Sequence, residues 1–374
     1  MPNTLLTVKE IAREALPILV NQLVFPALVY QDYSADFKGR GDTVTIKVPP
    51  AYTANEFDGE IDIQAANYGS VDVSMDKLAD VSVEVTSKDL ALKMADFLKQ
   101  QVEPMSIALA EKINADGLAL AKDIPYFSGT AGTTPDAVDD IMSIRQGLNA
   151  RKVLSTKRRA IWDVEADAKL TLNDKLIKQN ESGSTDALRE GTIGRVLGID
   201  NYFSQAVYVH TAGGATAATA PKANGDVEAG ATTMAIDATA MTGKLLKGDL
   251  FTIGTKTYVV TADTANASAN AIAAVSFYPA APAGGIANDT SIVFAEATAG
   301  GSVRNIGFNE RAFAFVTRSL PLPEGANGYT VSYNGITLRV VIAYDISTKK
   351  QIMSMDVLYG LKTIYPELAE AVLG

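Results

Sequence analysis

The chain has 374 residues, of which 47% are hydrophobic and 20% are charged, so it holds enough apolar material for two or three domains with a sizeable core. It contains no cysteine and a single histidine, which excludes disulfides, zinc–thiolate sites and thiol nucleophiles and leaves little for acid–base catalysis. The formal net charge of -10 argues against tight nucleic-acid binding, because neutralising phosphates requires a surplus of Lys and Arg on one face.

The first segment, residues 1–35, has the pattern of an N-terminal arm. Its apolar residues repeat at helical spacing, at Val8, Ile11, Ala15, Ile18 and Leu19. Pro17 and Pro26 are expected to interrupt this helix. Such a short helix buries little surface by itself, so we expect it to pack against another element. Because its apolar stretch is broken and no basic segment precedes it, we expect neither a signal peptide nor a membrane span.

Residues 36–86 alternate between apolar and polar side chains, as half-buried strands do. The runs GDTVTIKVPP and SVDVSMDKLADVSVEVTS have this alternation, and the polar, turn-rich run AYTANEFDGEIDIQAANYG lies between them. We interpret the segment as an extended two-stranded β-loop that projects from the body of the protein, together with peripheral strands.

The pattern of residues 87–125 predicts one long helix. Ser87 is a favourable N-cap, and Gly117 and Pro125 mark the end of the segment. An apolar stripe follows one helical face, at Leu90, Met94, Phe97, Leu98, Val102, Met105, Leu109, Ile113 and Leu120. Because the stripe stays in phase across Pro104, a single kinked helix is favoured over two unrelated helices.

The second half of the chain contains a segment of distinct composition. Residues 126–210 mix short helices and strands, whereas residues 211–298 are dominated by Ala, Thr and Gly. Within the latter, DLFTIGTKTYVVTA, AIAAVSFYPA and TSIVFAE have the pattern of short strands between turns, as in a small all-β barrel or sandwich. Mixed patterns resume over residues 299–374. We therefore interpret residues 211–298 as an inserted β-domain.

Few residues could carry chemistry. His210 lies at the edge of the proposed insertion, where a packing or boundary-loop histidine is expected rather than a catalyst. Asp58–Asp62 lacks the spacing of a calcium loop and is expected to be a solvated loop tip. The best candidate for polyanion binding is a basic run, Arg151, Lys152, Lys157, Arg158 and Arg159. The acidic total favours a solvated face, or ion pairs between subunits, for that run.

Two further patterns are assigned to structure rather than to chemistry. Gly191, Gly194 and Gly198 do not have the spacing of a phosphate-binding loop and are expected to be turn or packing glycines. Adjacent carboxylates such as Asp139 and Asp140 diverge on a helix, which does not suit paired acid–base work. The sequence therefore predicts no catalytic, cofactor-binding or metal site, and a protein that is not an enzyme.

The arm, the projecting loop and the long helix carry apolar faces that one compact body can hardly cover, which indicates assembly with other subunits. Four segments carry a more specific resemblance, SKDLALKMADFLKQQVEPMSIALAEKIN (87–114), DALREGTIGRVLGIDNYFSQAV (186–207), FNERAFAFVTRSLPLPEG (308–325) and YDISTKKQIMSMDVLYGLKTIYPELAEAV (344–372). In this order they resemble the tailed-bacteriophage major capsid (coat) proteins of the HK97 fold, in the branch with an inserted small β-domain.

The resemblance implies an α+β fold with an N-arm, an extended β-loop, a spine helix and an axial and peripheral domain in two parts, 126–210 and 299–374. It implies a structural protein that self-assembles in the host cytoplasm into pentamers and hexamers of an icosahedral shell around a double-stranded DNA genome. The implied partners are further copies of the chain, a scaffolding protein, a portal protein, a decoration protein in some relatives, and weakly held DNA, with no membrane. Some relatives crosslink through lysine, but nothing marks Lys38 or Lys47 as reactive, and we predict no crosslink.

A surface- or carbohydrate-binding protein that uses the β-domain is the alternative. It predicts clustered aromatic side chains around a ligand cleft. The aromatic residues of the segment are instead scattered along the sequence, at Phe251, Tyr258, Phe277, Tyr278 and Phe294.

Overall fold

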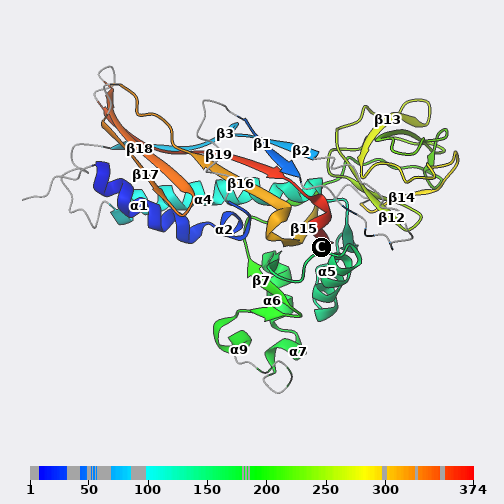
Figure 1. The fold of residues 1–374 in the computed structure, drawn as a ribbon, viewed down its shortest axis with the longest axis horizontal. Helices are drawn as coiled ribbons and strands as arrows, with labels where there is room; N and C mark the ends of the chain where they lie inside the picture. The colour runs from blue at the N-terminus through cyan, green and yellow to red at the C-terminus, as the bar shows by residue number, and fades with distance from the viewer. Residues whose placement is uncertain are drawn as a thin grey trace, which may run out of the picture. The chain divides into compact units, whose positions relative to one another are not determined.

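The structure is a computed structural model, and it describes residues 8–31, 43–48, 52, 54, 56, 69–85, 98–178, 181, 183, 186–296, 301–324, 327–345 and 350–374. The chain divides into two compact units, Met1–Pro26 with Tyr30–Ile113 and Phe313–Ile364, and Ala27–Val29 with Asn114–Ala312 and Tyr365–Gly374. Figure 1 shows that both units combine helices and strands. Within the described part of the chain, no helix has the length and apolar character needed to cross a membrane.

The first unit is built on a five-stranded antiparallel sheet. Its strands are β3 (Lys77–Val85), β16 (Phe313–Arg318), β17 (Asn327–Tyr333), β18 (Ile336–Asp345) and β19 (Lys350–Thr363). The order is β16-β19-β18-β17, and β3 also pairs with β19. The 14-residue strand β19 therefore organises the sheet, and it is formed by a segment far from β3 in the sequence.

The predicted two-stranded β-loop is found in part. Strand β1 (Thr43–Val48) pairs with β2 (Gly69–Ser74) in an antiparallel two-stranded sheet. Most of the residues between these strands, including Asp58–Asp62, lie outside the described residues. Strand β3, in the same predicted segment, does not belong to the two-stranded sheet and pairs with β19 along nine residues. A long-range pairing of this kind leaves no mark on the local alternation from which the loop was predicted.

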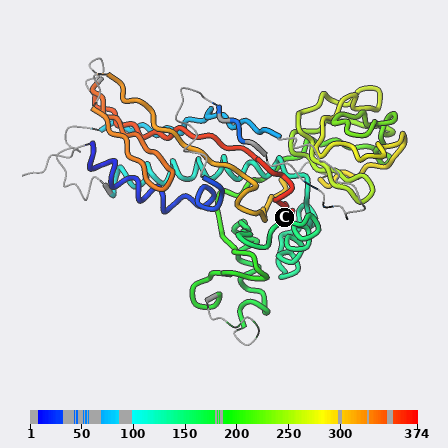
Figure 2. Tube along the Cα trace, in the orientation of Figure 1, coloured from blue at the N-terminus to red at the C-terminus, as the bar shows by residue number. Residues whose placement is uncertain are grey.

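Helix α1 (Val8–Gln22) covers part of the first unit's own sheet. Its buried face consists of Val8, Ile11, Ala12, Ala15, Leu16 and Leu19. This face packs on β17 and β18, and Figure 2 shows the blue helix beside the two orange strands. The arm's apolar face is thus covered within the chain. The expected break at Pro17 was wrong: Pro17 lies on the exposed side of the helix, where water can bond the carbonyl that the missing N–H leaves free. The short helix α2 (Phe25–Leu28) follows.

The described part of the predicted long helix is helical without a break from residue 98 to residue 123. It consists of a π-helical turn (Leu98–Val102), helix α4 (Glu103–Leu118) and a 3-10 turn (Ala119–Asp123). Residues 87–97 of the prediction lie outside the described residues. The stripe stays in phase, because Val102 and Met105 are buried on either side of Pro104, as are Leu109 and Ile113 farther on. Pro104 is the second residue of α4, where a missing N–H costs little, and the wider π-turn precedes its ring.

The second unit contains a seven-stranded mixed sheet. Its strands are β4 (Phe127–Gly129), β5 (Arg158–Trp162), β6 (Arg195–Val196), β7 (Ile199–Phe203), β8 (Val209–Thr211), β15 (Gly301–Asn309) and β20 (Ala369–Leu373). The order is β4-β20-β15-β5-β7-β6, with β8 paired to β15. Its helical segments are α5 (Val138–Ala150), α6 (Val164–Thr171), α7 (Asp174–Ile177), α9 (Asp186–Glu190) and the 3-10 turns Glu310–Ala312 and Pro366–Leu368.

Helix α5 covers one side of this sheet. Its buried residues Ile141, Ile144 and Leu148 form a core with Trp162 of β5 and Val372 of β20. The helix begins where it does because the backbone N–H groups of residues 136 and 137 both donate to the Asp140 carboxylate, at 3.0 Å each. This capping role is structural, as expected for the adjacent carboxylates of this helix.

A six-stranded antiparallel sheet forms from residues 222–294, within the Ala-, Thr- and Gly-rich segment. Its strands are β9 (Lys222–Ala223), β10 (Thr233–Asp237), β11 (Leu250–Ile253), β12 (Lys256–Val260), β13 (Ala271–Tyr278) and β14 (Ile292–Phe294), in the order β14-β11-β12-β13-β10-β9. Figure 2 shows it as one contiguous stretch of chain, in yellow-green. The chain enters and leaves through neighbouring strands, because Thr211 at the end of β8 lies opposite Gly301 at the start of β15.

The two faces of the six-stranded sheet bury different partners. One face forms the sheet's own core, in which the rings of Phe251 and Tyr258 stack at 5.3 Å and both contact Phe277 edge-on. On the other face, Leu250 and Val259 pack with Leu373 of β20, and Phe127 of β4 lies against this cluster. The six-stranded sheet is therefore attached to the seven-stranded sheet by apolar contact.

Candidate functional site

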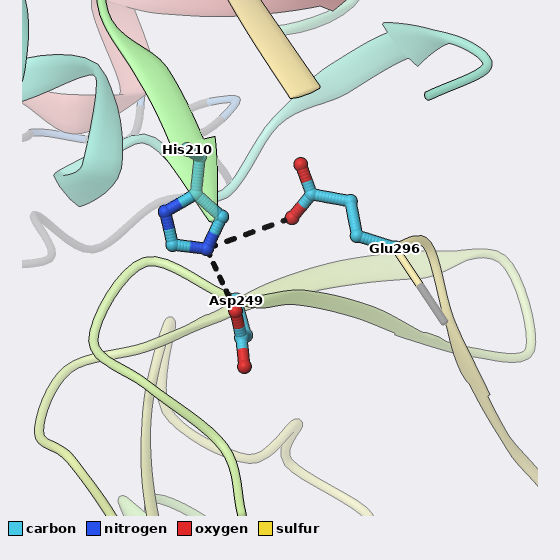
Figure 3. A group of neighbouring side chains, drawn as sticks. All are labelled: His210, Asp249 and Glu296. Carbon is cyan, nitrogen blue, oxygen red and sulfur yellow. Dashed lines mark hydrogen bonds and ion pairs between the residues drawn. The ribbon is translucent and has the colours of Figure 1, made fainter. Parts of the chain in front are cut away.

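Three ionisable side chains meet where the six-stranded and seven-stranded sheets join (Figure 3). His210 lies on β8, Asp249 immediately precedes β11, and Glu296 follows β14. The Nε2 atom of His210 lies 2.7 Å from Oδ1 of Asp249 and 3.8 Å from Oε2 of Glu296. All three residues are buried, with side chains that are 2%, 7% and 3% exposed. Burying an ionisable group costs free energy unless the group is paired. The partners of these three side chains therefore need to be identified.

Hydrogen bonds from the surrounding chain hold the other polar atoms of His210 and Asp249. The hydroxyl of Tyr208 lies 3.3 Å from Nδ1 of His210. The backbone N–H groups of Leu246 and Gly213 donate to Oδ2 of Asp249, at 2.8 and 3.2 Å. Burial raises the pKa of Tyr208, which keeps this hydroxyl protonated. The imidazole and the Asp249 carboxylate are thereby fixed in orientation.

Arg304 of β15 holds the third group. It is fully buried, and its guanidinium engages both Glu296 oxygens, with Nη2 at 2.6 Å from Oε2 and Nε at 3.3 Å from Oε1. Nη2 also donates to the carbonyl of Gly248, at 2.8 Å. Among the described residues, Nη1 has no hydrogen-bond partner. With a neutral imidazole, the cluster therefore has two carboxylates and one permanent cation, a net charge of -1.

An open cavity of about 410 Å³ lies at the surface beside the cluster and is lined by one of its members, His210. Its lining includes Lys122, Tyr208, His210, Lys247 and Asp263. Gly248 lies beside it with a φ of +104°, and a Cβ at this position would come within 2.9 Å of the Lys122 side chain and 3.1 Å of the imidazole. Glycine is therefore required where this loop passes the histidine.

The chemistry available to the cluster is binding or anchoring. Both ring nitrogens of His210 have partners inside the cluster, and Asp249 accepts from two backbone amides, so neither group is presented to a substrate atom as a general base would be. Imidazole nitrogen and carboxylate oxygens are metal-ligand types, and the three atoms lie within 4.8 Å of one another. His210 is otherwise the packing histidine that the sequence predicted.

The basic run is mostly used inside the chain. Arg151 donates to Oε2 of Glu370 at 3.0 Å, and its guanidinium lies 4.1 Å from the centre of the Tyr126 ring. Arg158 is buried and donates to the carbonyls of Val153 and Leu154.

Two more cations of the run share one carboxylate. Lys157 and Arg159 both pair with Glu310, at 2.5 and 3.8 Å, and Arg159 also donates to the carbonyl of Leu28. Lys152 and Lys157 are exposed, as the expected solvated face requires, whereas Arg151, Arg158 and Arg159 are buried or half-buried and have partners within the chain. Polyanion binding by the run is not favoured.

The remaining sequence predictions differ in outcome. Gly191, Gly194 and Gly198 have positive φ angles and open space around them, which confirms that they are turn glycines. Lys38 and the side chain of Lys47 lie outside the described residues. Asp249 and Glu296 were missed. Asp249 is 39 residues from His210 in the sequence, and only the fold brings them together.

Comparisons with known proteins identify the fold. No protein-family model and no curated protein matches the chain. A solved structure titled Mycobacterium phage Che8 is similar with a TM-score of 0.52 at 15% identity, over 94% of this chain and 90% of that chain. The capsid structure of the cyanophage P-SCSP1u has a TM-score of 0.45 at 13% identity, covering 89% of this chain and 83% of that chain. The mature capsid of bacteriophage PhiM1 has a TM-score of 0.45 at 12% identity, with coverages of 89% and 82%.

Identities this low show the fold alone. The similarity to the Che8 structure extends over nearly the whole chain, including both compact units. The chain therefore shares its fold with the phage protein of that structure, and this likeness agrees with the resemblance to tailed-phage proteins that its sequence carries.

Proposed function

We propose that this chain is a major capsid protein that self-assembles into an icosahedral shell around a double-stranded DNA phage genome. The observation that carries the proposal is the fold similarity to a phage structure along nearly the whole chain. The proposed architecture is that of the HK97 fold, with the six-stranded sheet as an inserted β-domain. The entry and exit of this segment through the paired strands β8 and β15 support an insertion.

The described surface is suited to many weak contacts. Exposed apolar side chains are distributed over both units, at Leu78, Leu154, Leu172, Leu188, Tyr202, Phe203, Tyr333, Tyr344 and Ile352. Contacts that are weak individually add up in a closed shell, because each subunit is held by several neighbours at once. The proposed partners are further copies in pentamers and hexamers, scaffolding and portal proteins, and a decoration protein where one exists.

The acidic composition supports weak contact with the packaged DNA. With a net charge of -10 and most of the basic run paired inside the chain, the protein offers little to neutralise phosphate. A shell wall of this kind would enclose DNA without retaining it strongly. The proposed location is the virion, after assembly in the host cytoplasm, and the proposed role is structural rather than enzymatic.

The carbohydrate-binding alternative has less support. Phe251, Tyr258 and Phe277 lie together in space, but they are buried in the core of the six-stranded sheet. A polar cleft of about 590 Å³ on this sheet has no aromatic side chain among the described residues that line it. Small-molecule sites are commonly lined by apolar and aromatic groups, with a few polar groups for orientation.

Assembly provides the test. The full chain would be expressed alone and with its scaffolding protein, then analysed by size-exclusion chromatography and negative-stain microscopy. We expect capsomer rings, tubes or closed shells in at least one of the two preparations. Discrete monomers or dimers in both would contradict the proposal.

A further inference from the structure

The cluster at the junction of the two sheets has the composition and arrangement of a metal site. We propose that His210, Asp249 and Glu296 bind a divalent transition-metal ion, with zinc as the best match to one imidazole and two carboxylates. The proposal concerns the folded subunit and does not depend on its assembly into a shell.

The two distances from the imidazole to the carboxylates require only a small adjustment, and the two carboxylate oxygens lie within 4.8 Å of each other. Ligands at 2.0–2.1 Å from a tetrahedral zinc ion lie about 3.3 Å from one another. The Nε2 atom of His210 is 2.7 Å from the Asp249 oxygen and 3.8 Å from the Glu296 oxygen, so the two distances depart from this value by about half an ångström in opposite directions. A small swing of the imidazole away from Asp249 and toward Glu296 would make them equal.

The atoms that would not bind the ion are already held. Tyr208 contacts Nδ1 of His210, two backbone amides donate to Oδ2 of Asp249, and Arg304 engages Glu296. Partners of this kind orient metal ligands and fix the imidazole tautomer. A carboxylate has about four lone-pair sites, so Oε2 of Glu296 keeps one for a metal while it accepts from Arg304.

The competing explanation of the cluster is a hydrogen bond from His210 without any metal. It explains the contact with Asp249 but not the position of Glu296. The Nε2 atom can carry one hydrogen, which serves Asp249 at 2.7 Å. The Glu296 oxygen at 3.8 Å is beyond hydrogen-bond range, although its carboxylate is turned toward the imidazole (Figure 3). A metal ion would bind all three atoms at once. Its positive charge would also offset the net negative charge of the two carboxylates and Arg304.

Two further observations are compatible with a bound ion and its water. Nη1 of the fully buried Arg304 has no partner among the described residues, so this donor is available to a bound water. Water completes the coordination of zinc sites with three protein ligands. The cavity lined by His210 gives an ion a route from solvent.

The consequence of binding would be to fasten the two sheets. His210 belongs to β8 of the seven-stranded sheet, whereas Asp249 and Glu296 flank β11 and β14 of the six-stranded sheet. An ion that binds only the folded chain stabilises it by an amount that grows with the logarithm of the ratio of free ion concentration to Kd.

The experiment uses the full chain after treatment with a chelator. Isothermal titration with zinc chloride is expected to give one ion per chain, and the melting temperature should rise with added zinc. Because His210 is the only histidine, a protein labelled with ¹⁵N-histidine gives signals from one imidazole. Stoichiometric zinc should shift its Nε2 resonance, and cobalt should give the visible spectrum of a tetrahedral nitrogen–oxygen site.

Variants locate the site. His210→Gln and Glu296→Gln should weaken zinc binding at least tenfold, and Tyr208→Phe should weaken it by about 10- to 100-fold through loss of the bond to Nδ1. Asp263→Asn is the matched control: it alters an acidic residue that lines the same cavity without belonging to the cluster, and it should bind as tightly as the parent.

Three results would overturn the proposal: absence of saturable zinc binding by the parent chain, equal binding by His210→Gln, or imidazole signals that respond to pH but not to zinc. The last measurement needs no substitution, so it decides the question even if the variants fail to fold.

Discussion

At the residue scale, the carboxylate of Glu370 lies so close to helix α5 that only glycine fits at the point of contact. Glu370 of β20 lies against α5 at Gly147, where a Cβ would fall 1.5 Å from Oε2. Arg151 pairs with it at 3.0 Å. Burial nevertheless outweighs this pairing and raises the pKa of Glu370 to about 6. The ionised carboxylate is therefore a cost to the fold at neutral pH.

This residue gives a pH-dependent prediction. The pKa of Glu370 in the folded chain, about 6, lies above the ordinary 4.5, so the folded state binds the proton more tightly than the unfolded state. The resulting stabilisation is complete below about pH 4.5 and is lost as the pH rises through about 6. A shift of this size corresponds to about 2 kcal/mol.

Glu370→Gln removes the titration. The difference in unfolding free energy between parent and variant should therefore change by about 2 kcal/mol between pH 4.5 and pH 7, in favour of the variant at the higher pH. Urea unfolding at a series of pH values measures it. The exposed Glu228→Gln serves as control, and a difference that stays constant with pH for both variants would contradict the assignment.

At the element scale, charged side chains cross the sheet of the first unit. Asp356 of β19 lies opposite Arg339 of β18 on one side and Asp80 of β3 on the other. Arg339 binds Asp356 through Nε at 2.9 Å, and this bond raises the pKa of Arg339. Asp80 instead accepts from Ser354 and Ser82. The arginine thus compensates one of two neighbouring carboxylates on adjacent strands.

Arg339→Met should destabilise the chain by about 2–3 kcal/mol, because it leaves the Asp356 carboxylate buried beside Asp80 without a counterion. Lys350→Met is the matched control on the same sheet. The Lys350 pair with Glu84 is about half exposed, so its loss should cost less than about 1 kcal/mol. Chemical unfolding of the two variants measures the contrast, and equal losses would show that the buried pair has no special role.

Helix α4 gives a second prediction at this scale, which rests on the proposed function. Pro104 lies where the π-turn passes into α4, so Pro104→Ala should keep the fold, with a stability change within about 1 kcal/mol. Removal of the ring lets the junction adopt a different bend, and the diameter or maturation of assembled shells should change. Electron microscopy of particles before and after maturation tests this. Identical particles in both states would reduce Pro104 to a residue that starts a helix.

At the scale of the whole molecule, the six-stranded sheet is part of the second unit and not a freely tethered module. Leu250 and Val259 share an apolar cluster with Leu373, and Arg304 depends on Glu296 for its counterion. A further link joins β13 to the turn before β20. There burial raises the pKa of Tyr278 to about 12, and the Glu367 carboxylate that accepts its hydrogen bond contributes.

Removal of the segment between Thr211 and Gly301, with the ends joined, should therefore leave a foldable but less stable chain. The deletion exposes Leu373, at a cost of about 1.5–3 kcal/mol, and strips Arg304 of its partners. Soluble yield and melting temperature measure the loss. Adding Leu373→Ser and Arg304→Gln to the deletion should recover part of the yield. A deleted chain that melts at the temperature of the parent would contradict the proposed attachment.

Much of the fold was predictable from local pattern. The helical spacing of α1 and the stripe across Pro104 appear in the structure, because burial of one helical face fixes a period that the sequence must carry. In the Ala-, Thr- and Gly-rich segment, strands β11 to β14 lie within the runs predicted between turns, whereas β9 and β10 were not predicted. The break at Pro17 was predicted wrongly because exposure, which tolerates a proline, is a property of the folded helix and not of its sequence.

The candidate site was not predictable. His210 was singled out only because it is the one histidine in the sequence. Asp249 and Glu296, which lie beside it in the structure, are separated from it along the sequence by strands of the six-stranded sheet. Likewise, the basic run gave no sign that Glu370 and Glu310 would neutralise it, because those carboxylates are supplied by β20 and by the turn after β15.

The sequence by itself determined the periods, the turns, the compositional boundary near Thr211 and the absence of cysteine chemistry, because each of these depends on residues that are neighbours along the chain. The tertiary structure alone decided which strands pair, which strands cover the apolar face of α1, and which charged side chains lie beside His210. These outcomes depend on contacts between residues far apart in the sequence, where one partner gives no local signal of the other.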